Sequence, residues 1–66
     1  MTKTEYMLFK FKQHIENIGV AYETGLLSLD ELREIKSAKL KTCNEYPQAI
    51  RDEMKNFILT WYEKYI

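Results

Sequence analysis

The sequence contains one cysteine, one histidine, one proline and two glycines among 66 residues. One cysteine excludes a disulfide within the chain, and one cysteine with one histidine cannot complete a tetrahedral zinc shell. We therefore expect no metal site and no cofactor. A domain of this size buries a core that is only marginally sufficient for stability. We accordingly expect a protein partner or a homodimer to supply additional stability.

The chain also has no net charge at pH 7, because ten Lys and Arg residues are balanced by ten Asp and Glu residues. The balance holds along the chain, so no segment supplies the net positive field from which phosphate binding draws much of its affinity. Direct nucleic-acid binding is therefore not expected. No apolar run approaches the roughly 18 residues of a transmembrane helix, and Met1–Glu5 lacks the organisation of a signal peptide. We expect a cytoplasmic protein that does not bind a membrane.

Hydrophobic periodicity is the main feature that is present. Hydrophobic residues make up 45% of the chain and aromatic residues 14%. This apolar content is too high for a disordered chain. The apolar residues recur at helical spacing, which predicts an all-α fold of three helices over about residues 4–24, 29–43 and 47–65, in one domain spanning 1–66. The predicted core stripes are Leu8, Phe11, Ile15, Ile18 and Tyr22; Leu29, Leu32, Leu40 and Cys43; and Ile50, Met54, Phe57, Ile58, Trp61 and Tyr65.

Local signals predict where the first two helices begin and end. Thr2 with Glu5, and Ser28 with Glu31, have the spacing of a capping box, in which each side chain binds the other residue's backbone N–H. Gly25 suits the left-handed residue that ends a helix. The first two helices are therefore expected to form a helical hairpin.

Two further residues affect the helices. Pro47 disfavours helical geometry at Tyr46 and fits the first position of the third helix. Gly19 weakens the first helix by about 1 kcal/mol relative to alanine. It either lets another helix approach closely or marks a bend.

Catalytic signals are few. His14 flanks the stripe of the first helix without a nucleophile near it in sequence, and Cys43 is interpreted as a small buried residue. The acidic pairs Asp30-Glu31 and Asp52-Glu53 fall in the first turns of predicted helices, where they favour the helix dipole. We therefore expect neither an enzyme nor a small-molecule substrate.

Apolar and aromatic residues outside the stripes are the candidates for partner binding. A large side chain such as Phe9 costs solubility if it is left in water. Either the third helix packs across this side and makes it core, or the side is a dimer or partner face. The predicted partner-binding residues are Tyr6, Phe9, Gln13, Val20, Leu59, Tyr62 and Ile66.

The densest basic cluster comprises Arg33, Lys36, Lys39 and Lys41. Such a cluster is either a solvated face or a contact for phosphate or an acidic partner. For Lys36, the alternatives are a side chain whose stem packs while its ammonium reaches solvent, or an ion pair near Glu16 or Glu23.

The middle of the chain resembles the short helical-hairpin modules called SHOCT domains. Their pattern places spaced apolar residues before a glycine, then two aliphatics and a hydroxyl residue, an acidic pair, a lysine and a closing leucine. The resemblance covers about residues 15–41 and implies an oligomerisation or protein-docking role. The matching residues are Ile15, Ile18, Ala21, Gly25-Leu26-Leu27-Ser28, Asp30-Glu31-Leu32, Lys36 and Leu40.

The opening of the chain is similar to the Hha/YmoA family of small helical co-regulators. The similar segments are Thr2-Lys3-Thr4-Glu5-Tyr6-Met7-Leu8, Ser28, Asp30-Glu31-Leu32, Ser37-Ala38 and the near-terminal Trp61. This resemblance implies action through a nucleoid-associated protein. Lys39-Leu40-Lys41 stands where that family has Ala-Asp-His-Arg, so no functional residue is carried over.

These observations favour a non-enzymatic protein-protein interaction module, a small regulator or inhibitor that binds another protein or oligomerises. A phage or mobile-element origin would suit its size. The alternative is a transcriptional co-regulator that contacts DNA directly or through a nucleoid-associated protein.

Overall fold

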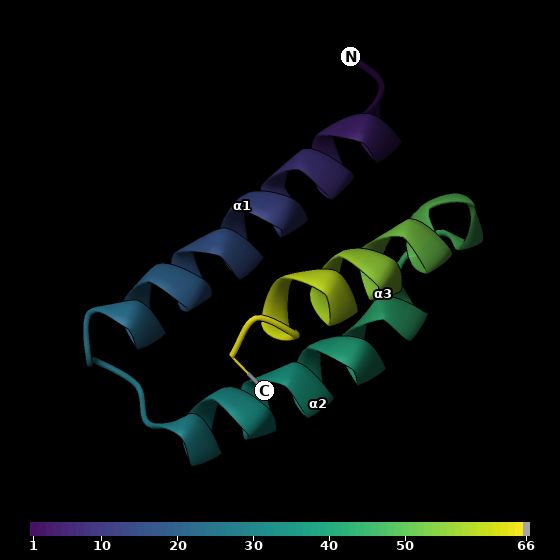
Figure 1. The fold of residues 1–66 in the computed structure, drawn as a ribbon. Helices are drawn as coiled ribbons and strands as arrows, with labels where there is room; N and C mark the ends of the chain where they lie inside the picture. Colours follow the sequence, from purple (N-terminus) through teal and green to yellow (C-terminus); the bar gives the residue numbers. More distant parts are fainter. Residues whose placement is uncertain (66) are drawn as a thin grey trace.

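Three α-helices lie over Lys3–Glu23 (α1), Leu29–Thr42 (α2) and Gln48–Tyr62 (α3), with a short 3-10 helix, η1, at Cys43–Glu45. The computed structural model describes residues 1–65. Figure 1 shows α3 lying between α1 and α2, parallel to α1 and antiparallel to α2. The prediction of an all-α bundle with an initial helical hairpin is confirmed for the described residues.

Side-chain caps begin α1 and α2, but of the two predicted capping boxes only the one at α2 has both of its hydrogen bonds. The Thr2 hydroxyl accepts a hydrogen bond from the Glu5 backbone N–H at 3.1 Å. At the start of α2 the capping box is complete, because the Glu31 N–H donates to the Ser28 hydroxyl at 3.1 Å and the Ser28 N–H donates to the Glu31 carboxylate at 3.0 Å. These bonds satisfy backbone donors that lack a partner within the helix.

Gly25 ends α1 as predicted, with a φ of +84° that a residue with a Cβ rarely adopts. Its N–H donates to the Tyr22 carbonyl at 3.1 Å, and the Leu26 N–H donates to the Ala21 carbonyl at 2.9 Å. This pair of bonds is a Schellman motif, which turns the chain sharply toward α2.

The later boundaries differ slightly from the predictions. Cys43 begins η1 instead of closing α2, and Pro47 is the residue before α3 instead of its first residue. The third helix ends at Tyr62, because the Tyr65 N–H donates to the Tyr62 carbonyl in a tighter turn. The Tyr65 ring then packs edge-on against Tyr22 of α1, with ring centroids 5.0 Å apart.

One continuous core joins the three helices, and α3 contributes half of its fully buried residues. The buried side chains are Phe11, Ile15, Leu32, Cys43, Ile50, Met54, Ile58 and Tyr62. All but Tyr62 belong to the predicted stripes. The predictions for Leu8, Ile18, Tyr22, Leu40, Phe57, Trp61 and Tyr65 are also confirmed, because these residues pack partly buried against the core.

Gly19 brings α1 and α3 together. It is buried, and a Cβ added to it would overlap the indole nitrogen of Trp61 and lie 3.2 Å from its Cε2. Of the two alternatives for this glycine, the structure therefore supports close approach of a helix. Farther along the same pair of helices, the Lys12 ammonium binds the Glu53 carboxylate at 2.8 Å and lies 5.5 Å from the centroid of the Phe57 ring.

The prediction that Tyr62 binds a partner is wrong. Its side chain is 0% exposed and belongs to the core. The physical reason is helical spacing, because Tyr62 lies four residues after Ile58 and eight after Met54, on the row that faces the core. Its hydroxyl has no hydrogen-bond partner among the described residues.

Replacing Gly19 by alanine should destabilise the protein. Overlap with the rigid indole places the cost of overpacking toward the upper end of about 1 to 3 kcal/mol, above the gain of about 1 kcal/mol in helix propensity. Urea unfolding followed by circular dichroism measures the difference. As a control, alanine at the exposed helical residue Ser37 should raise the unfolding free energy by about 0.5 kcal/mol. A Gly19→Ala variant as stable as the Ser37→Ala variant would contradict the close contact.

Replacing Tyr62 by phenylalanine should raise the free energy of unfolding by about 1 kcal/mol, because it removes a buried hydroxyl without a partner and keeps the ring. Burial, together with the nearby Tyr65, raises the pKa of Tyr62 to about 12. The folded state therefore holds the proton more tightly than the unfolded chain, whose tyrosine pKa is about 10. This contribution to stability is present below pH 10 and is lost as the pH rises toward 12.

Chemical unfolding between pH 8 and pH 12 measures both effects. The Tyr62→Phe variant should lose less stability across this range than the parent. Part of the loss of stability should remain in this variant, because the pKa of Tyr65 is also raised, mainly by its hydrogen bond to Glu23. Tyr6→Phe, at an exposed position, is the matched control and should follow the parent. Identical alkaline profiles for the parent and Tyr62→Phe would show that the phenol is solvated.

Candidate protein-binding groove

A groove runs between α1 and α2 and consists of two adjoining pockets of about 330 and 430 Å³. The first, the Phe11 pocket, is lined by Tyr6, Met7, Lys10, Phe11, His14, Lys39, Thr42 and Tyr46. The second, the Ile18 pocket, is lined by His14, Asn17, Ile18, Ala21, Leu27, Ile35 and Lys39. His14 and Lys39 line both pockets. We call the two pockets together the α1–α2 groove.

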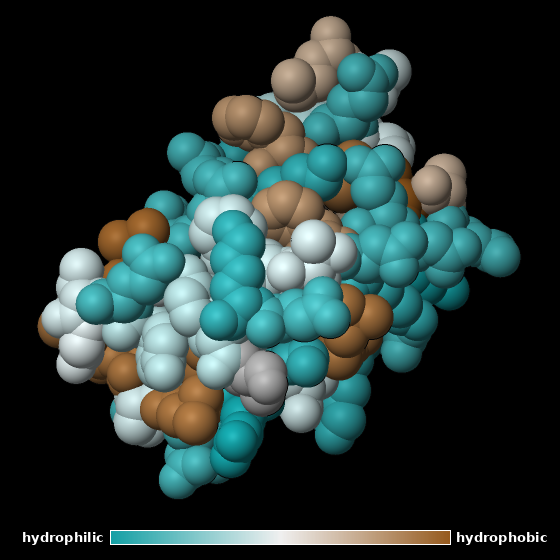
Figure 2. Space-filling view, in the orientation of Figure 1, coloured by the Kyte–Doolittle hydropathy of each residue, from teal (hydrophilic) through white to brown (hydrophobic). Residues whose placement is uncertain are grey.

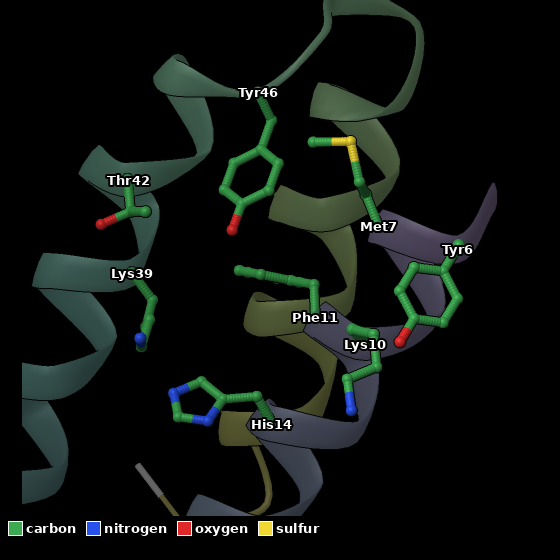
Figure 3. Close-up of a pocket in the computed structure, with 8 residues that line it drawn as sticks. All are labelled: Tyr6, Met7, Lys10, Phe11, His14, Lys39, Thr42 and Tyr46. Atoms are coloured by element: carbon green, nitrogen blue, oxygen red, sulfur yellow. The ribbon is translucent and has the colours of Figure 1, made fainter. Parts of the chain in front are cut away.

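The groove exists because α1 and α2 are held apart. Both helices pack against α3, while α1 and α2 contact each other only lightly. Among the described residues, none from α3 lines either pocket. Figure 3 shows α3 passing behind the side chains of the Phe11 pocket. The groove is therefore the side of the α1–α2 pair that α3 leaves uncovered.

Aromatic side chains form the wall of the Phe11 pocket. The rings of Phe11 and Tyr46 meet edge to face, with centroids 5.8 Å apart. Tyr46 is held in the extended conformation that Pro47 favours, and the Arg51 guanidinium donates to its carbonyl at 2.8 and 3.2 Å. Met7 closes the end of the pocket (Figure 3). These contacts hold the apolar wall of the pocket in place.

Basic side chains line the middle of the groove. Figure 3 shows the His14 ring and the Lys39 ammonium pointing toward one another from α1 and α2. Partial burial lowers the pKa of His14, and the positive charge of Lys39 lowers it further. Lys10 adds a third basic side chain, whereas no residue that lines either pocket is acidic. The groove therefore has an apolar surface with an excess of positive charge.

The predicted partner face on α1 is exposed but not continuous. Tyr6, Phe9 and Val20 are between 52% and 54% exposed, so the alternative that α3 buries them is wrong. Phe9 and Val20 lie eleven residues apart, which is about 16 Å along the helix. Exposed Gln13 belongs to the same side of the helix. Of these residues, only Tyr6 lines the groove.

The remaining predicted partner residues lie elsewhere. Leu59 is 45% exposed on α3, Tyr62 is in the core, and Ile66 lies outside the described residues. The face of the molecule seen in Figure 1 is mostly hydrophilic, and Figure 2 shows its hydrophobic side chains in separate patches. The seven predicted residues therefore do not form one surface.

The predicted basic cluster does not form one surface either. Arg33 lies 3.7 Å from the Asp30 carboxylate at an exposed site, and Lys36 is half-buried with no ion pair to Glu16 or Glu23. Lys39 lines the groove, while Lys41, two residues later, is exposed about 200° around the helix. Lys39 is thus the one member of the cluster that the structure places at the candidate site.

Outside the groove, the potentially reactive thiol of Cys43 belongs to the core. Cys43 is fully buried, as predicted, and burial raises the pKa of its thiol, which disfavours the reactive thiolate. Within residues 1–65, no three His, Cys, Asp or Glu side chains come close enough to hold a metal ion. None of the helices described is both long and apolar enough to span a bilayer.

Sequence reasoning missed most of the groove. Met7, His14 and Ala21 lie seven residues apart on α1, and Ile35, Lys39 and Thr42 share one side of α2. This helical spacing of residues next to the predicted core stripe of each helix was the available signal for the groove, because residues at such spacing share a helix face. The sequence pattern does not say whether a neighbouring helix covers that face.

No protein-family model, curated protein or solved structure matches this chain. The resemblances to SHOCT domains and to the Hha/YmoA family therefore remain predictions.

Proposed function

We propose that this chain is a non-enzymatic interaction module that acts as a small regulator or inhibitor by binding another protein or by oligomerising. The observation that carries this proposal is the α1–α2 groove, an apolar surface that the chain's third helix leaves uncovered. Apolar surface that is left in water lowers solubility, and a monomeric protein of this size has little stability to spare. A partner seated in the groove would relieve both costs.

Preorganisation also supports binding at this groove. Its walls are helices fixed by caps and by a shared core, and its aromatic end is held by the Arg51–Tyr46 contact. A rigid apolar surface loses little entropy on binding, so more of the contact energy appears as affinity. The exposed side chain of Tyr6 lies at the α1 edge of the groove and would extend the contact.

Photo-crosslinking in the source cell tests this function. Benzoylphenylalanine at Ile35 lies in the groove, whereas the same residue at exposed Asn56 of α3 does not. We expect a discrete covalent adduct from position 35, with another protein or with a second copy, and none from position 56. Mass spectrometry then identifies the partner.

Adducts at neither position and none from the same residue at exposed Phe9, together with a strictly monomeric particle in light scattering, would contradict an interaction role. Circular dichroism of the substituted proteins establishes that they keep the helical fold.

A further inference from the structure

The α1–α2 groove has two apolar pockets, and the boundary between them is formed by the His14 imidazole and the Lys39 ammonium. Building on the interaction role proposed above, we propose that the groove receives an amphipathic helix of a partner protein. This helix carries a carboxylate between two apolar residues that lie seven positions apart. Helix-in-groove binding of this kind uses apolar side chains on one face of the helix as anchors.

The spacing of the pockets matches a helix. Phe11 lines only the first pocket and Ile18 only the second, and they lie seven residues apart on α1. This separation is about 10 Å along the helix axis. In a partner helix that runs along the groove, apolar residues at positions i and i+7 are the same distance apart on one face. Positions i+3 and i+4 then fall between the pockets, next to Lys39 and His14.

Charge complementarity selects the residue at that middle position. No acidic residue lines either pocket, and within residues 1–65 neither Lys10 nor Lys39 forms an ion pair. The chain as a whole is neutral, so this positive excess is local to the groove. A partner carboxylate would give Lys39 a counter-charge and offset the cost of covering its ammonium.

The same charges argue against a second copy that docks groove to groove. Such a dimer would place the Lys39 ammonium opposite the same group of its partner. Like charges placed across an interface are unfavourable by several kcal/mol. The favoured occupant is therefore an acidic helix from a different protein.

The shape of the fold supports a helical occupant. The groove extends along α1 from Tyr6 to Ala21, about 22 Å or four helical turns. Behind the groove, α3 packs against both α1 and α2 (Figure 3). A partner helix opposite α3 would complete a four-helix bundle, whose core would include Met7, Ile35 and Tyr46.

The test is a selection from phage-displayed 18-residue helical peptides, with positions i, i+3, i+4 and i+7 of one face randomised, against the full chain. We expect enrichment of apolar residues at i and i+7 and of Asp or Glu at i+3 or i+4. Fluorescence anisotropy with the winning synthetic peptide then gives its Kd.

Two charge reversals on the same helix locate the binding site. Lys39→Glu should weaken the winning peptide at least about tenfold. Lys41→Glu, the same change on the outer side of α2, should leave its Kd within about twofold, because exposed charges contribute little. A peptide with lysine at its acidic position should bind Lys39→Glu better than it binds the parent. Circular dichroism checks that both variants stay folded.

Each other outcome overturns the proposal. Failure to enrich any peptide, enrichment without an acid at the middle positions, or equal losses in the two variants would each refute it. If the peptides lose affinity for the Phe9→Ala variant but not for the Lys39→Glu variant, they bind the outer side of α1. The interaction role would then stand, and the assignment to the groove would fail. The crosslinking experiment decides the interaction role separately.

Discussion

The packing of α3 between α1 and α2 is the constraint on which the rest of this structure depends. It requires a glycine at position 19, because the Trp61 indole occupies the space that any Cβ there would need. It buries Tyr62 against the core although its hydroxyl finds no hydrogen-bond partner. By holding α1 and α2 apart, it also leaves their opposite side open as a groove. Stability and the candidate site thus have one structural origin.

The proposed interaction role rests on three features of the groove. Its aromatic wall is rigid, its middle carries His14 and the Lys39 ammonium from two helices, and the rest of its surface is mostly apolar. Such a surface gains affinity from apolar contact and specificity from a single well-placed charge. A very small protein can achieve selective binding in this way without a loop-built site.

Most of the fold was predictable because its signals are local. A capping box, a left-handed glycine and an X-Pro pair each act within a few residues, so Ser28, Gly25 and Pro47 mark the helix boundaries from sequence alone. The site was not predictable, because it depends on which face of each helix a distant helix covers. The prediction for Tyr62 was wrong although the four-residue step from Ile58 indicated burial. The exposure of Phe9 depends on the position of α3, which no local pattern specifies.

Nuclear Overhauser effects between the Trp61 indole and the α-protons of Gly19 test the central claim most directly, in the unmodified protein. The account predicts strong cross-peaks between these groups, because the indole lies directly against the glycine. A spectrum without these cross-peaks, in which the indole is solvent-exposed, would show that α3 does not pack against α1 at Gly19. That result would contradict the packing of α3 and, with it, the groove that this packing leaves open.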